Sequence, residues 1–167
     1  MEFKPGGEVT VERIVLPGPL ERELNESLVL FFTGITRDSS SILTEQESMM
    51  PARAEVLREL GDMAREARTR VVGGNLEAIG PLLHESWQLK RRLASKVSNG
   101  AIDEMYEAAR RAGALGGKIT GAGGGGFLLL HCPDGRRTAV RHALRGLREL
   151  PFQFEPDGSK VIFNYRR

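Results

Sequence analysis

The sequence lacks the features of disulfide-rich, exported or membrane-embedded proteins. Its 167 residues include one cysteine, Cys132, so no disulfide can form within the chain, and a cytoplasmic location is expected. No apolar signal core follows Met1, and the longest apolar runs are far too short to span a bilayer. No second cysteine or histidine lies at a ligand spacing from His131 and Cys132, so no metal site is expected within the chain.

The sequence also lacks an excess of charge of one sign. The 24 lysines and arginines are nearly balanced by 22 aspartates and glutamates, and only 6% of the residues are aromatic. Nucleic-acid binding usually needs a basic surface, and single strands need aromatic stacking platforms, so no nucleic-acid partner is expected. With 40% apolar residues, the chain can bury one good core, and one domain is predicted.

The first half of the chain contains two strand patterns and the start of a helix. Residues 8–16 alternate apolar and polar side chains, which predicts a strand, and residues 17–19 (PGP) predict a turn. The continuous apolar run Leu28–Phe32 predicts a strand that is buried on both faces. A helix is expected to begin near Ser39, where serine hydroxyls follow one another.

The middle of the chain predicts three helices. The first runs from Pro51 to the glycines at 73 and 74, and the second covers residues 82–93, with Pro81 in its first turn. The third runs from about Asn99 to Gly113. These segments have apolar residues at helical spacing, which is typical of helices packed on a core.

The last third is dominated by a glycine-rich segment, residues 116–126, that leads into the strand-like run Phe127–His131. A helix from Asp134 to just before Pro151 and a strand at 160–165 are expected to follow. The order of strands and helices predicts an α+β fold, a ferredoxin-like split β-α-β sandwich with extra helices.

A run of four glycines between two strands costs backbone entropy, so it indicates positive φ or a close backbone approach. Binding of phosphate by successive N–H groups is the usual reason, and a flexible surface turn is the alternative. A Walker A loop is excluded because Ala112 and Ile119 stand at two of its required positions. A dinucleotide loop is excluded because a strand follows where a helix is required, and the other protein-kinase motifs are absent.

The glycine-rich segment with Phe127 (residues 116–127, GGKITGAGGGGF) resembles the third conserved motif, K-x-x-G-A-G-G-G-G, of the GHMP (galactose, homoserine, mevalonate, phosphomevalonate) kinases. Residues 32–40 (FTGITRDSS) resemble the strand-to-helix segment near the acceptor site of that family. Residues 84–90 (HESWQLK) resemble a helix of its heptose-phosphate kinase branch. Together these likenesses cover most of the chain after Val9.

The resemblance implies the C-terminal domain of a kinase that uses ATP and Mg²⁺ to phosphorylate a sugar or sugar phosphate. It implies acceptor contacts from Arg37, Ser39 and Ser40, although Ser39 could instead cap the helix beside a solvated Arg37. It implies that ATP phosphate contacts come from Lys118, Gly121, Ala122, Gly123, Gly124, Gly125 and Gly126. Lys118 could instead be a solvated edge charge, and Trp87 favours a place in the core over a sugar-stacking role.

The family's first phosphate motif, Pro-x3-Gly-Leu-x-Ser-Ser-Ala, does not occur in the sequence. The catalytic base and the Mg²⁺ ligands are also expected from the N-terminal kinase half, so no catalytic residue is assigned here. Residues 1–27 are interpreted as a strand and connection from that half, residues 28–167 as the C-terminal domain, and the chain alone is expected to be inactive. The heptose 7-phosphate kinases are the nearest branch; a fucose- or galactose-type kinase half and a stand-alone ligand-binding or regulatory module are the alternatives.

Overall fold

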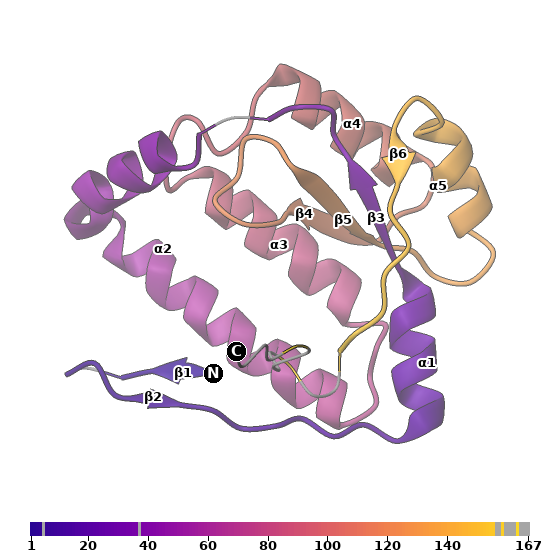
Figure 1. The fold of residues 1–167 in the computed structure, drawn as a ribbon, viewed down its shortest axis with the longest axis horizontal. Helices are drawn as coiled ribbons and strands as arrows, with labels where there is room; N and C mark the ends of the chain where they lie inside the picture. The colour runs from indigo at the N-terminus through magenta and orange to yellow at the C-terminus, as the bar shows by residue number, and fades with distance from the viewer. Residues whose placement is uncertain (5, 37, 156–157, 159–162, 164–167) are drawn as a thin grey trace.

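The computed structural model describes residues 1–4, 6–36, 38–155, 158 and 163 (Figure 1). The chain begins with two short strands and a helix, and a larger sheet with four helices follows. In chain order the elements are β1 (Glu2–Phe3), β2 (Val9–Thr10), α1 (Gly18–Ser27), β3 (Leu28–Phe32), α2 (Ser40–Val72), α3 (Ile79–Arg91), α4 (Gly100–Arg111), β4 (Gly116–Ile119), β5 (Phe127–His131), α5 (Arg137–Ala143) and β6 (Arg148–Glu149).

The larger sheet has the strand order β4-β5-β3-β6, and every neighbouring pair is antiparallel. Helices α2, α3 and α4 connect β3 to β4, and α5 connects β5 to β6. The two strands that each connection joins are not neighbours in the sheet: β5 lies between β3 and β4, and β3 lies between β5 and β6. This is the split β-α-β arrangement, so the predicted α+β ferredoxin-like fold is confirmed.

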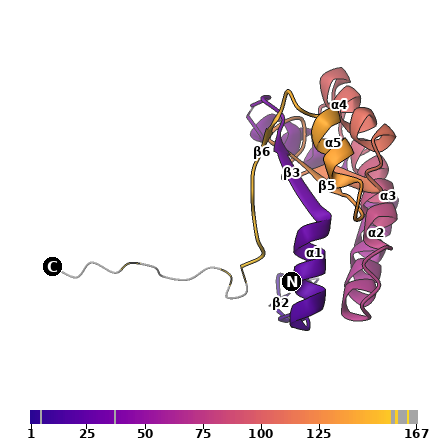
Figure 2. The same ribbon diagram turned by 90° about the vertical axis from the view of Figure 1, so that its right-hand side faces the viewer.

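The main core lies between one face of this sheet and the helices α3, α4 and α5, which gather on the same side of β3 and β5 (Figure 2). Phe31 and Leu128 are paired neighbours on that face, and both are buried. Trp87, Tyr106 and Val140 pack against them from the three helices. Trp87 is fully buried, which confirms its predicted place in the core.

The N-terminal segment differs from its prediction. The strand expected over residues 8–16 is reduced to Val9–Thr10, which pairs with Glu2–Phe3. Val11 and Val15 beyond it are exposed, so the alternating pattern has no surface to pack on in this chain. The turn expected at 17–19 is instead the start of α1, because a proline suits the first turn of a helix.

Helix α2 joins two segments that were expected as separate elements. It begins at Ser40, as predicted, and continues through Pro51 to Val72. Because proline removes one helical hydrogen bond, it bends a helix more readily than it ends one when both flanks are strongly helical, and α2 changes direction in Figure 1. The predictions for α3 and α4 are confirmed: Pro81 lies in the first turn of α3, and the Asn99 side chain accepts a hydrogen bond from Ile102 N at 3.0 Å.

The C-terminal part corrects two expectations. Asp134 does not cap α5, which begins at Arg137, and its carboxylate pairs with the Arg137 guanidinium at 3.2 Å. The fourth strand is β6, which the sequence pattern did not predict; Leu150 N also donates to Leu30 O at 2.8 Å beside it. The strand expected at 160–165 lies outside the described residues except for Phe163.

None of the helices in the described part of the chain combines the length and apolar character that a membrane span needs. Within the same residues, no three or more histidine, cysteine, aspartate or glutamate side chains form a group that could hold a metal ion.

Candidate functional site: the glycine loop and its neighbours

The glycine loop, residues 120–126, joins β4 to β5 and is held by two other connections of the fold. Gly126 N donates to Ile35 O at 2.8 Å, and its carbonyl accepts from both the amide and the hydroxyl of Thr33, each at 2.9 Å. Gly124 N also donates to Val97 O at 2.6 Å. The β3–α2 connection and the α3–α4 connection therefore both clamp the loop, and a flexible surface turn does not describe it.

Several of the glycines have a conformational or packing reason of their own. Gly124 and Gly126 have φ values of +70° and +81°, which residues with a side chain rarely adopt. A Cβ atom on Gly125 would lie 2.5 Å from Ile35 O, and one on Gly123 would lie 2.9 Å from Val97 O. The close backbone approach that the glycine run predicted is thus made to the two clamping segments.

The clamp also decides which loop amides are available to a ligand. The amides of Gly124 and Gly126 are used inside the protein. Within the described residues, four loop amides donate no hydrogen bond: those of Gly121, Ala122, Gly123 and Gly125. A loop with fixed carbonyl anchors and unpaired N–H groups is chemically suited to an anion.

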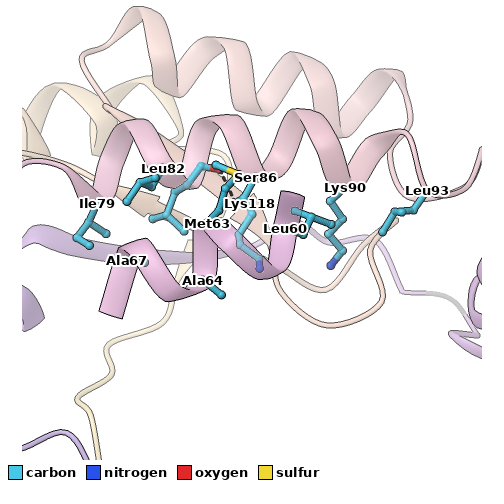
Figure 3. Close-up of a pocket in the computed structure, with 11 residues that line it drawn as sticks. Leu60, Met63, Ala64, Ala67, Ile79, Leu82, Ser86, Lys90, Leu93 and Lys118 are labelled. Atoms are coloured by element: carbon cyan, nitrogen blue, oxygen red, sulfur yellow. Dashed lines mark hydrogen bonds between the residues drawn. The ribbon is translucent and has the colours of Figure 1, made fainter. Parts of the chain in front are cut away.

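Lys118 lies in β4 just before the loop, and it is half-buried rather than solvated. Its side chain enters a cavity of about 380 Å³ between α2, α3 and β4, and Lys90 of α3 reaches the same cavity (Figure 3). The Lys90 ammonium donates a hydrogen bond to the Gly121 carbonyl oxygen. Burial, together with the charge of Lys118, lowers the pKa of Lys90 to about 8, and burial also lowers the pKa of Lys118.

The proposed acceptor segment follows directly after the connection that clamps the loop. Ser39 is the N-cap residue of α2, but its side chain makes no capping hydrogen bond. Asp38 engages Ser40 instead: its carboxylate accepts from Ser40 N at 3.0 Å and from the Ser40 hydroxyl, and these bonds lower the pKa of Asp38. Both serines are exposed, and Arg37 lies outside the described residues.

His84, Trp87 and Lys90 form a row along α3 whose members have different surroundings. Trp87 is core, and His84 Nδ1 lies 2.7 Å from the Tyr106 hydroxyl, so both support packing. Lys90 reaches the glycine loop, and sequence reasoning did not single it out as a site residue. Its helical spacing from Trp87 was visible, but the contact with Gly121 depends on how α3 lies along β4.

The strand order and the clamped glycine loop define a ferredoxin-like domain with a glycine-rich loop at the end of its β4–β5 hairpin. More particularly, the chain belongs to the family described as GHMP kinases C terminal, whose profile matches residues 52–147. This confirms the resemblance seen in the glycine motif.

Known kinases resemble the chain over most of its length. D-glycero-alpha-D-manno-heptose 7-phosphate kinase of Campylobacter jejuni is 26% identical over 147 residues, which are 87% of this chain and 43% of that protein. A mevalonate kinase of Pyrococcus horikoshii is 31% identical over 119 residues, 68% of this chain and 35% of that protein. The chain thus spans less than half the length of each.

Solved structures show the same fold. A D-glycero-D-manno-heptose 1-phosphate kinase from Bacteroides thetaiotaomicron superimposes with a TM-score of 0.65 at 22% identity, covering 91% of this chain and 40% of that one. The L. major mevalonate kinase bound to R-mevalonate gives a TM-score of 0.61 at 26% identity, covering 71% of this chain and 37% of that one.

Proposed function

We propose that the chain provides the C-terminal domain of an ATP-dependent kinase that phosphorylates an alcohol group of a sugar or sugar phosphate. Membership of the GHMP family and the likeness to the C. jejuni heptose 7-phosphate kinase support this proposal. The observation that carries it is the glycine loop, whose clamped backbone leaves unpaired amides beside two lysines.

In this proposal the loop and Lys118 contact the phosphates of ATP. Phosphoryl transfer depends mainly on positioning and on stabilising the charge of the transferred group. Rigid N–H donors and a nearby ammonium serve both purposes, because they need no rearrangement when charge develops. The available donors are the amides of Gly121, Ala122, Gly123 and Gly125, whereas Gly124 and Gly126 hold the loop in place.

The acceptor is proposed to contact Arg37, Ser39 and Ser40. The position of this segment, next to the connection that clamps Gly126, supports the proposal. For Ser40 to donate to an acceptor, its hydroxyl must leave the Asp38 carboxylate. Acceptor binding at this place would therefore compete with Asp38.

An N-terminal kinase half is proposed to supply the first phosphate loop, the catalytic base and the Mg²⁺ ligands, and residues 1–27 connect to it. Among the described residues no three or more histidine, cysteine, aspartate or glutamate side chains form a metal-binding group, and no step is assigned to that ion here. We expect the purified chain alone to release no ADP from ATP with heptose 7-phosphate, fucose or galactose. Turnover above that of a heat-inactivated sample would contradict the need for a second half.

Nuclear magnetic resonance of the purified chain tests the proposed nucleotide contact. Addition of ATP should shift the amide resonances of Ala122, Gly123 and Gly125, and leave those of Gly6 and Gly7 in the distant β1–β2 turn unchanged. Shifts produced by a sugar phosphate but not by ATP would assign the loop to the acceptor. An unresponsive loop would contradict the proposed function.

A further inference from the structure

The cavity between α2, α3 and β4 has an apolar wall and a basic edge (Figure 3). Leu60 and Met63 line it from α2, and Leu82 lines it from α3. Ser86, which also lines it, donates its hydroxyl hydrogen to the Leu83 carbonyl oxygen at 3.1 Å, so that group is already used. Among the described residues that line the cavity, the charged ones are Lys90 and Lys118.

Among the described residues, no carboxylate pairs with the charge of either lysine. No carboxylate lines the cavity, and neither lysine belongs to an ion pair in the part of the chain that the structure describes. Two partly buried ammonium groups that repel each other cost free energy unless an anion binds between them. With a pKa of about 8, Lys90 still holds its proton at neutral pH, so the repulsion persists there.

The hydrogen-bonding capacity of both groups is also unfilled. An ammonium has three N–H donors. Lys90 uses one of them on the Gly121 carbonyl oxygen, which fixes its head group beside the glycine loop. The Lys118 ammonium has no hydrogen-bond acceptor among the described residues. Several donors therefore remain for a ligand at the edge of the cavity.

We infer that Lys90 and Lys118 together bind one phosphate group at the edge of this cavity, beside the glycine loop. A phosphate monoester carries a charge close to −2 near neutral pH, which matches two ammonium groups, whereas a carboxylate carries only one charge. Lysine is a common phosphate ligand because it acts as a compact point charge. The phosphate belongs either to the acceptor or to the nucleotide, and its use in phosphoryl transfer rests on the proposed function.

Titration of the purified chain with inorganic phosphate, in a buffer free of other oxyanions, tests the site without any need for turnover. Loss of a charged hydrogen bond weakens binding by about tenfold or more. We therefore expect K90Q and K118Q each to weaken phosphate binding by about that factor. The matched control is K4Q, which removes the same charge from the exposed N-terminal turn and should bind as the wild type does.

Equal phosphate affinity in wild type, K90Q and K118Q would overturn the inference, as would an equal loss in K4Q. If a glutamine variant fails to fold, the wild type still decides the question, because bound phosphate should raise the pKa at which the Lys90 ammonium titrates by NMR. An unchanged titration midpoint would then reject the site.

Competition identifies the source of the phosphate. Displacement of inorganic phosphate by a sugar phosphate assigns the site to the acceptor, and displacement by ATP assigns it to the nucleotide. Lysine-dependent phosphate binding that neither compound displaces would preserve the anion site and contradict the proposed function, so the two failures are distinguishable.

Discussion

Replacement of Gly125 by alanine would add one methyl group at a tight contact of the glycine loop. The added Cβ atom would lie 2.5 Å from Ile35 O and 3.1 Å from the Ile35 carbonyl carbon. These are backbone atoms, so no side-chain rotation relieves the clash. Ile35 O also accepts the hydrogen bond from Gly126 N, and moving it away would break one of the loop's two clamps.

The magnitude follows from these two effects. Overpacking in a well-packed region costs about 1–3 kcal/mol, and the lost hydrogen bond adds about 0.5–1.5 kcal/mol. The free energy of unfolding should therefore fall by about 2–4 kcal/mol in G125A. In a protein of this size each kcal/mol changes the Tm by about 2–4 °C, so the Tm should fall by about 4–16 °C.

Two other glycines provide graded controls for the same thermal and urea denaturation experiments. A Cβ atom on Gly121 would meet nothing within 4 Å, but the φ of +71° is strained for alanine, so G121A should lose about 1 kcal/mol. Gly100, at the start of α4, has neither a close neighbour nor a positive φ, and G100A should change stability by at most about 1 kcal/mol. If G125A were as stable as G100A, the clamp argument would be refuted.

Three further predictions concern the core. W87A should lower the free energy of unfolding in urea by about 3–5 kcal/mol because Trp87 is fully buried, and a loss below about 1 kcal/mol would remove it from the core. Burial lowers the pKa of His131 below its ordinary value of 6.5, so the unfolded chain takes up its proton first as the pH falls, and stability should decrease below about pH 6.5. H131L should flatten that decrease, and the control H142Q, at an exposed site, should not. Some dependence of stability on pH should remain in H131L, because burial also lowers the pKa of His84. If stability fell equally steeply with pH in the two variants, His131 would not be its cause. Burial raises the pKa of Cys132 to about 12, so iodoacetamide should alkylate it only after unfolding. Alkylated Cys132 detected by mass spectrometry in protein treated while folded would contradict this prediction.

Those parts of the fold that depend on local pattern could be predicted from the sequence. The apolar runs Leu28–Phe32 and Phe127–His131 form strands with the predicted bounds, because both lie in the middle of the sheet, where burial rewards a continuous apolar run. Asn99 marked the start of α4 because its side chain supplies the cap locally.

Elements that depend on a distant partner could not be predicted in the same way. Residues 8–16 have the alternating pattern of a strand, yet only Val9 and Thr10 pair in the structure, since a strand pattern specifies a surface and not the partner that covers it. Conversely, β6 is only two residues long, Arg148 and Glu149, and has no apolar pattern. It is fixed by pairing with β3 and by the Arg141–Glu149 ion pair at 2.8 Å.

The candidate site likewise has features that a local sequence pattern marks and features that depend on distant residues. The glycine motif marked the loop and Lys118, but the sequence could not show which loop amides the fold consumes, since Val97 and Ile35 reach the loop from connections far away in the chain. The same limit applies to Lys90, whose contact with Gly121 joins residues 31 positions apart.

The clamp on the loop determines how experiments on this site can be interpreted. Because Gly125 packs on Ile35 and Gly124 donates to Val97, a glycine substitution that abolishes activity would be explained equally well by a displaced loop. Lys90 and Lys118 are better probes, since their head groups lie at the cavity edge and their replacement by glutamine leaves the backbone clamp intact. If K90Q and K118Q lose phosphate binding while their Tm is unchanged, the loss can be attributed to these two side chains. Glycine substitutions could not show this, because they also displace the loop.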